Sequence, residues 1–195
     1  IAWWKQFPKP LRLLTKARLI ASAGAGGVIY LTPLVFNKIN FSANEIGSGI
    51  ALAALIGTFA RFFSGALLDR GINYSTPLKV AAGLAIIADL VLLDANNHNE
   101  YLIGQILLGS AAGLYWPAVE LSVPASCKSF PTNKGFALVR TGDAIGTSLG
   151  ASIGAIITLT SHVRLIYLVD LISMGLLILL IDENPILNSQ SSSRK

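Results

Sequence analysis

Residues 65–71 read Gly65-Ala66-Leu67-Leu68-Asp69-Arg70-Gly71, a short polar turn between two long apolar stretches, residues 46–68 and 78–93. A glycine lies four residues before the Asp-Arg pair, and another glycine follows the pair directly. Charged side chains cost free energy inside a bilayer, so this turn indicates a point where the chain leaves the membrane. The stretch therefore predicts a membrane protein whose second and third spans are joined here.

Composition supports burial in lipid. The chain of 195 residues is 53% hydrophobic and 13% charged, with a mean hydropathy of +0.62, whereas soluble domains carry about a quarter charged residues. Its 18 glycines are typical of membrane helices, in which small residues let backbones approach closely. The single cysteine, Cys127, excludes an internal disulfide, and no residue spacing suggests a metal site. We expect no metal and no other cofactor.

Six apolar stretches have about the length that a membrane helix needs. A bilayer core of about 30 Å requires roughly 20 apolar residues in a helix. The stretches lack alternation at period two and are too long for strands. We predict an all-α membrane protein with a six-helix bundle over residues 19–182, whose transmembrane helices cover residues 19–36, 46–68, 78–93, 101–123, 136–160 and 165–181.

Lysine and arginine predict the orientation of the bundle. Twelve of the fifteen basic residues lie on one predicted side: in residues 1–18, in the turn between the second and third spans, in the loop between the fourth and fifth spans, and in residues 183–195. Two lie in loops on the opposite side, and Arg61 lies within a span. By the positive-inside rule, both termini are cytoplasmic and the protein is integral to the cell membrane. We expect residues 1–18 to be an interfacial segment and residues 183–195 a polar linker or tail. Attraction to anionic lipid headgroups explains the excess of basic residues. We therefore expect no nucleic-acid partner.

The turn at residues 65–71 resembles the loop motif of the major facilitator superfamily of transporters, which joins the second and third helices on the cytoplasmic side. The resemblance implies half of a twelve-helix fold, built from two inverted three-helix repeats. Because the chain starts at Ile1 and its one methionine is Met174, we expect a fragment or a processed form. The N-terminal half is our prediction, and the C-terminal half is the alternative because related turns recur there.

The implied function is secondary active transport of a small solute by alternating access, with the second six-helix half and the bilayer as partners. An efflux permease is one possibility, because residues 146–155 resemble the fifth-helix motif of drug/proton antiporters. That motif has proline at Ala151 and glycine at Ala155, and both are missing here. The alternative is a six-helix membrane scaffold or sensor that transports nothing.

In the superfamily, charges at cytoplasmic helix ends hold that side shut and rearrange during transport. In this chain we expect the corresponding charged residues, Asp69, Arg70, Glu120 and Arg140, to form one mutually paired cluster with Asp143. The alternative is a purely structural ion network. Further arginines usually follow the motif, but residues 72–79 offer only Lys79. The predicted gate residues, taken from the motif and from helix position, are Gly65, Asp69, Arg70, Gly71, Glu120 and Arg140.

Arg61 is the charge placed deepest in a predicted span, about 12 Å from Asp69 along a helix. It either lines a central cavity or extends its side chain to the cytoplasmic surface. Asp89 and Asp170 are interpreted as solvated carboxylates at outer helix ends, with proton coupling as the alternative. The candidate substrate-cavity residues are Arg61, Tyr30, Tyr115 and Trp116.

Four glycines spaced by four residues lie along one face of the fifth predicted helix, where a neighbouring helix can pack closely. They are Gly142, Gly146, Gly150 and Gly154. The same region contains a Gly-x-Ser-x-Gly pattern around Ser148, typical of hydrolases, but Ser148 is in mid-span and both histidines lie in outer loops. The sequence therefore predicts no enzyme and no catalytic residue.

Overall fold

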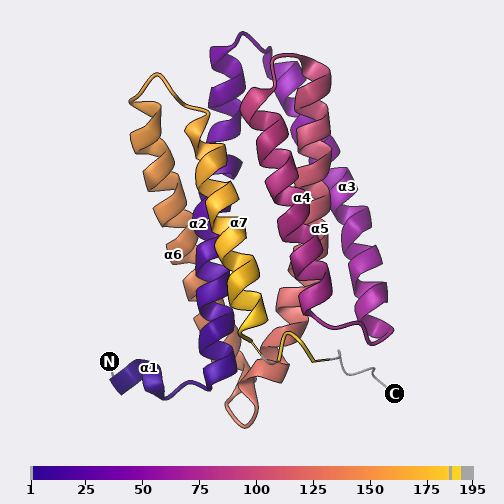
Figure 1. Ribbon diagram of the computed structural model, residues 1–195, viewed down its shortest axis with the longest axis vertical. Helices are drawn as coiled ribbons and strands as arrows, with labels where there is room; N and C mark the ends of the chain where they lie inside the picture. Colours follow the sequence, from indigo (N-terminus) through magenta and orange to yellow (C-terminus); the bar gives the residue numbers. More distant parts are fainter. Residues whose placement is uncertain (1, 185, 190–195) are drawn as a thin grey trace.

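The computed structural model describes residues 2–184 and 186–189 and contains seven helices within them, with no strand in that part of the chain (Figure 1). This confirms the predicted all-α class. A short first helix precedes six long ones. Their bounds are α1 (Ala2–Lys5), α2 (Lys9–Lys38), α3 (Ala43–Asp69), α4 (Ser75–Asp94), α5 (His98–Cys127), α6 (Thr132–Thr158) and α7 (Leu165–Asp182).

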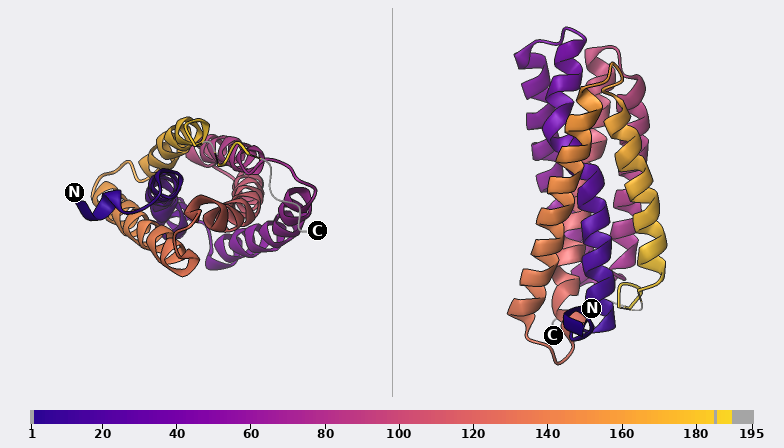
Figure 2. Two further views of the ribbon diagram at one scale, coloured as in Figure 1. Left: turned by 90° about the horizontal axis from the view of Figure 1, so that it is seen from below. Right: turned by 90° about the vertical axis from the view of Figure 1, so that its left-hand side faces the viewer.

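The six long helices run side by side along the long axis of the molecule (Figures 1 and 2). Helix α2 packs mainly against α6 and α7, and α5 packs mainly against α3 and α4. Helices α4 and α7 also contact each other and so join the two groups. Helix α1 and the segment that follows α7 lie at the same end of the bundle (Figure 1).

Five of the described helices, α2, α3, α4, α5 and α7, are long and apolar enough to cross a membrane. Helix α6 has 27 residues but is less apolar, because glycines, small polar residues and three charged residues interrupt its hydrophobic positions. Large apolar side chains such as Phe59, Phe62 and Ile156 are exposed on the outside of the bundle. Lipid rather than water is the solvent in which such a surface is favourable.

The first long helix begins at Lys9, not at the predicted boundary before residue 19. Pro10 lies in the first helical turn, where its missing N–H costs nothing. Leu11 and Leu14 are buried in the core, and Arg18 is only 7% exposed. Basic residues interrupt the apolar run in this stretch, so its length alone did not indicate that one face is buried. Residues 9–18 are therefore part of the helix bundle.

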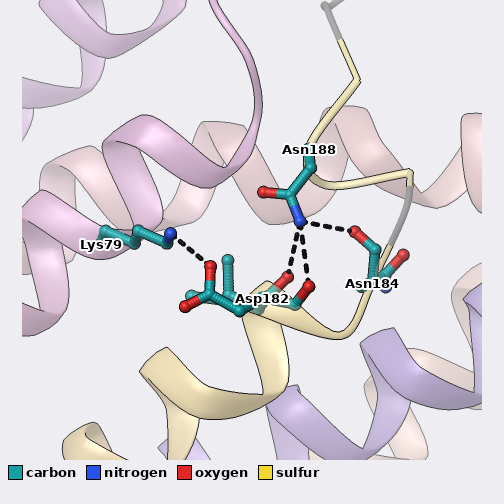
Figure 3. A network of polar contacts seen from close by, with 5 residues as sticks. Lys79, Asp182, Asn184 and Asn188 are labelled. Atoms are coloured by element: carbon teal, nitrogen blue, oxygen red, sulfur yellow. Dashed lines mark hydrogen bonds and ion pairs between the residues drawn. The ribbon is translucent and has the colours of Figure 1, made fainter.

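The segment after α7 folds back onto the bundle (Figure 3). Leu187 is fully buried, and its carbonyl oxygen accepts a hydrogen bond of 2.7 Å from the backbone N–H of Ser75. The Asn188 amide donates to the carbonyl oxygens of Ile181, Asp182 and Asn184. Part of the predicted polar tail is thus anchored, whereas its residues 185 and 190–195 lie outside the described part of the chain.

An ion pair and an amide further tie this segment to neighbouring helices. Lys79 of α4 pairs with Asp182 at the end of α7 (Figure 3). Asn184 is fully buried, and its side-chain amide donates to the carbonyl oxygen of Pro10 at 3.3 Å. These contacts connect the ends of α2, α4 and α7 at one end of the bundle.

The four predicted packing glycines of α6 are all buried and face α2. A Cβ atom at Gly142 would lie 2.9 Å from the Thr15 methyl carbon, and one at Gly146 would collide with the carbonyl oxygen of Leu19. The same holds for Gly150 against Ala23, and for Gly154 against a side chain of α2. The two backbones approach closely because these residues lack a side chain.

Candidate functional site

An ion pair inside the bundle joins α2 to α6. The guanidinium of Arg18 lies 2.7 Å from Oδ1 of Asp143, and the side chains are 8% and 21% exposed. The Ser22 hydroxyl donates to the same oxygen at 2.6 Å. Arg18 and Ser22 are four residues apart on α2, so they point from one helix face toward the same carboxylate. Burial makes each of these charges dependent on the other.

Two aromatic rings of α5 cover the Arg18 side chain. The guanidinium carbon lies 3.9 Å from the centre of the Trp116 ring and 5.1 Å from that of Tyr115. Both distances are within the range of cation–π attraction. Arg18 is thus held by a carboxylate on one helix and by aromatic faces on another, which fixes its position in the bundle.

These residues line a cavity of about 300 Å³ between α2, α4, α5, α6 and α7. Small side chains, including Ala21, Ala81 and Ala85, form much of its wall and leave the space open. Its polar groups are the Arg18–Asp143 pair and the nearby hydroxyl and carboxyl groups. A mostly apolar pocket with a few converging polar groups is the usual form of a small-molecule site.

Three of the four predicted cavity residues, Tyr30, Tyr115 and Trp116, line this cavity. Arg61 does not; it lines a second cavity of about 260 Å³ between α2, α3 and α5. The two cavities share Ile29 among their lining residues and are therefore adjacent. The structure brings the aromatic residues together and places Arg61 on the neighbouring side of α5.

Asp89 and Asp170 are not solvated helix-end carboxylates. Asp89 on α4 is 0% exposed and Asp170 on α7 is 2% exposed, and Asp170 lines the first cavity. Their positions in the sequence, a few residues from helix ends, suggested contact with water. The prediction was wrong because neighbouring helices cover both side chains, which the sequence pattern did not indicate.

The motif turn at residues 65–71 has one residue that requires glycine. Gly71 has φ 85°, a backbone conformation that strongly favours glycine, and its N–H donates to the Leu68 carbonyl oxygen at 2.9 Å. Around Gly65 there is open space, because a Cβ atom there would meet nothing within 4 Å. The turn thus ends α3 sharply and leaves Asp69 and Arg70 exposed.

The expected single cluster of charges at the cytoplasmic helix ends does not form. Arg140 pairs with Glu120 at 2.6 Å, but Asp143 pairs with Arg18 instead. Asp69 and Arg70 make no ion pair with any described residue. Helix α3, which ends at Asp69, packs mainly against α5, whereas Arg140 and Asp143 are on α6, which packs mainly against α2.

Sequence reasoning missed Arg18 as a site residue because it directly precedes the first apolar run and was counted with the interfacial basic residues. Ser22 was missed because a serine in an apolar stretch is common in membrane helices. A usable signal did exist, since Arg18 and Ser22 are spaced by four and a charge of opposite sign, Asp143, interrupts another predicted span. The pairing itself requires that α2 and α6 are neighbours.

Comparisons with known proteins agree with this architecture. A region of 131 residues is 26% identical to the transcription regulatory protein OpdE of Pseudomonas aeruginosa, and the match covers 66% of this chain and 31% of that protein. The crystal structure of a peptide transporter, POT, in complex with alafosfalin superposes with a TM-score of 0.73 at 17% identity. That match covers 93% of this chain and 39% of the transporter, so the chain spans well under half of either relative.

The sequence profile of the Major Facilitator Superfamily matches residues 14–195, nearly the whole chain. The matched region includes helices α3 to α7, all of α2 after its first five residues, the motif turn and the cavity. The likeness to the peptide transporter shows that the fold is also of this type. The chain is an integral membrane protein that belongs to the major facilitator superfamily.

Proposed function

We propose that this chain is the N-terminal half of a secondary active transporter that moves a small solute by alternating access. The observation that carries the proposal is the cavity of about 300 Å³ with a buried ion pair at its wall. Intramembrane charges that face a cavity commonly mark a substrate pathway. The six-helix bundle would move as a unit against a second six-helix half.

The cavity favours a substrate that carries both signs of charge. Arg18 can bind an anionic group, and Asp143 can bind a cationic group, at the two ends of one ion pair. Trp116 and Tyr115 offer aromatic faces beside the arginine. A small zwitterionic solute could open the pair and satisfy both residues, so neither charge would be left buried without a partner. Arg61 would line the extension of this pathway in the second cavity.

Helix packing supports two inverted three-helix repeats. Two related repeats would make α2 equivalent to α5, α3 to α6, and α4 to α7. Under this equivalence the α2–α6 contact corresponds to the α5–α3 contact. The same equivalence relates the α2–α7 contact to the α5–α4 contact and leaves the α4–α7 contact unchanged. The main helix contacts therefore have the symmetry that two related repeats would produce.

The gate is proposed to involve the motif turn and the Arg140–Glu120 pair. Asp69 and Arg70 are exposed and free of ion pairs within the described chain, so they are available to a second half of the transporter. Such contacts would hold the cytoplasmic side closed and break when the halves move. The basic residues at this end support an orientation in which it faces the cytoplasm, together with both termini, in a cell membrane.

A flux assay with the intact protein in proteoliposomes tests the proposal. A panel of radiolabelled amino acids, dipeptides and sugars is offered, and uptake of at least one is expected. Asp69→Asn should abolish that uptake while membrane insertion stays normal. The matched control is Asp94→Asn, an exposed aspartate at the opposite end of α4, which should transport normally. Normal uptake by Asp69→Asn would refute its role in the gate.

A non-transporting sensor is the second candidate, because the related OpdE protein is named as a transcription regulatory protein. In that case the cavity would bind a ligand and the motif turn would only connect helix ends. Ligand binding without flux of any bound solute would favour the sensor. Flux of a bound solute would exclude it.

A further inference from the structure

Two aspartates, Asp89 on α4 and Asp170 on α7, are buried on neighbouring helices and take no part in the Arg18–Asp143 pair. Asp89 is 0% exposed and Asp170 is 2% exposed. Both carboxyl oxygens of Asp89 and Oδ1 of Asp170 lack a hydrogen-bond partner among the described residues. Buried polar atoms without partners are rare in folded proteins and require an explanation.

The two aspartates lie at a similar depth in the bundle. Asp89 is five residues before the end of α4, and Asp170 is five residues after the start of α7, or about 7.5 Å from each helix end. At that end, Arg164 donates to the carbonyl oxygens of Leu93 and Ala95 at 2.9 and 2.6 Å. At the other end, α4 and α7 are joined through the ion pair of Lys79 with Asp182. Both ends of the helix pair are therefore held together around the carboxyl groups.

No neighbouring charge neutralises the pair. From α2, Arg18 reaches the same cavity but is bound to Asp143. From α7, Arg164 is occupied with the backbone at the end of α4. Other titratable groups nearby are phenols, Tyr167 on α7, Tyr101 on α5 and Tyr115, which lines the cavity with Asp170. The Tyr167 hydroxyl bonds to Thr32 at 3.1 Å, and that of Tyr101 donates to Ile46 at 2.8 Å.

We propose that Asp89 and Asp170 form a proton-binding site that exchanges with the cavity through Asp170. In this site a proton from cavity water forms an O–H bond with a carboxylate oxygen, and its release returns it to water. Carboxylates buried without hydrogen-bond partners in a low-dielectric interior are costly to ionise, so one or both of these hold a proton at neutral pH. If the protein is a transporter, the coupling ion that the proposed function leaves unassigned would be the proton bound at this site. That coupling role rests on the proposed function, but proton binding does not.

A metal ion fits the site less well than a proton. Calcium and magnesium require six or more oxygen ligands, whereas the site offers two carboxyl groups. The nearby Ser173 hydroxyl already donates to the Val169 carbonyl oxygen at 2.9 Å. No group of three or more metal-ligating side chains occurs in the part of the chain that the structure describes. A proton needs only one carboxylate oxygen.

Access to the proton comes from the cavity side. Asp170 lines the cavity, whereas Asp89 lies behind it and is fully covered. A Cβ atom at Gly24 of α2 would collide with Oδ1 of Asp170, so the absence of a side chain there makes room for the carboxyl group. Asp170 thus connects the buried partner to the space in which a substrate would bind.

Infrared spectroscopy of the intact protein in detergent tests the proposal without a transport assay. Protonated carboxyl groups give a C=O stretching band that is separate from the carboxylate bands. At pH 7 the protein should show this band, which should shift in D₂O and disappear as the pH is raised. The double variant Asp89→Asn/Asp170→Asn should lose the band, because asparagine has the same shape but cannot ionise. The matched control Asp94→Asn, an exposed aspartate on α4, should keep it.

Three results would overturn the proposal. One is absence of the band in the unaltered protein at pH 7, which needs no variant and applies even if the double variant does not fold. Another is full band intensity in a double variant whose circular dichroism shows normal helix content. The third is loss of the band on addition of sodium chloride but not choline chloride, which would assign the site to sodium. None of these results depends on whether the protein transports a solute.

Discussion

The close contact of α2 with α6 leads to a quantitative prediction about single methyl groups. Gly150 of α6 lies against the backbone of α2, and a Cβ atom there would be 2.9 Å from the Ala23 carbonyl carbon and 3.1 Å from the Gly27 nitrogen. Backbone atoms cannot rotate away as a side chain can. Gly150→Ala must therefore push the two helices apart, which weakens contacts along the whole interface.

Gly83 of α4 supplies the matched control. It is also inside a helix and partly buried, but a Cβ atom at Gly83 would meet nothing within 4 Å. Alanine gains about 0.5–1 kcal/mol over glycine in a helix interior, and this gain is common to both variants. Overpacking costs about 1–3 kcal/mol and applies to Gly150→Ala alone. The free energy of unfolding should therefore be lower for Gly150→Ala than for Gly83→Ala by that amount.

Thermal unfolding in detergent measures the difference. For a chain of 150–250 residues, 1 kcal/mol corresponds to about 2–4 °C in Tm. The Tm of Gly150→Ala should be roughly 2–12 °C below that of Gly83→Ala by the same conversion. Equal Tm values would show that α2 and α6 are not in close backbone contact, and the helix packing described here would be wrong.

Two further predictions concern buried polar contacts. Asp143→Ala leaves the guanidinium of Arg18 buried without its carboxylate, so the free energy of unfolding should fall by about 3–5 kcal/mol. The double variant Arg18→Met/Asp143→Leu should recover most of this loss. A single variant as stable as the double variant would contradict the prediction. Tyr101→Phe removes the hydroxyl that donates to the Ile46 carbonyl oxygen at 2.8 Å. The free energy of unfolding should therefore fall by about 0.5–1.5 kcal/mol. An unchanged Tm would mean that this hydrogen bond contributes nothing to stability.

Local sequence patterns were enough to predict the class of the protein and its helix order. Apolar length and polar punctuation are properties of neighbouring residues, so the six long helices and the turn at Gly71 could be recognised directly. The packing face of α6 was also predicted, because a spacing of four places Gly142, Gly146 and Gly150 on one side of any helix. Tyr30, Tyr115 and Trp116 were expected in a cavity from the resemblance to transporters and not from a spacing, and they line one. Arg61, expected with them, lines the neighbouring cavity.

The site depended on which helices are neighbours, and that is not encoded in any local pattern. Arg18 and Asp143 come from α2 and α6, which are far apart in the sequence, and their pairing separates Asp143 from the charges at the helix ends. Asp89 and Asp170 appeared to be near water because they are close to helix ends, but α4 and α7 bury each other's carboxyl groups. Leu187 was expected in a polar tail, and the chain reversal after α7 buries it.

The amino-acid sequence by itself determined that this chain is helical, that it spans a membrane and where it turns, because each depends on short-range hydrophobicity and backbone preference. The tertiary structure decided which charges are paired and which are buried alone. The physical reason is that the free energy of a charge is set by the atoms around it, and in this bundle those atoms come mostly from other helices.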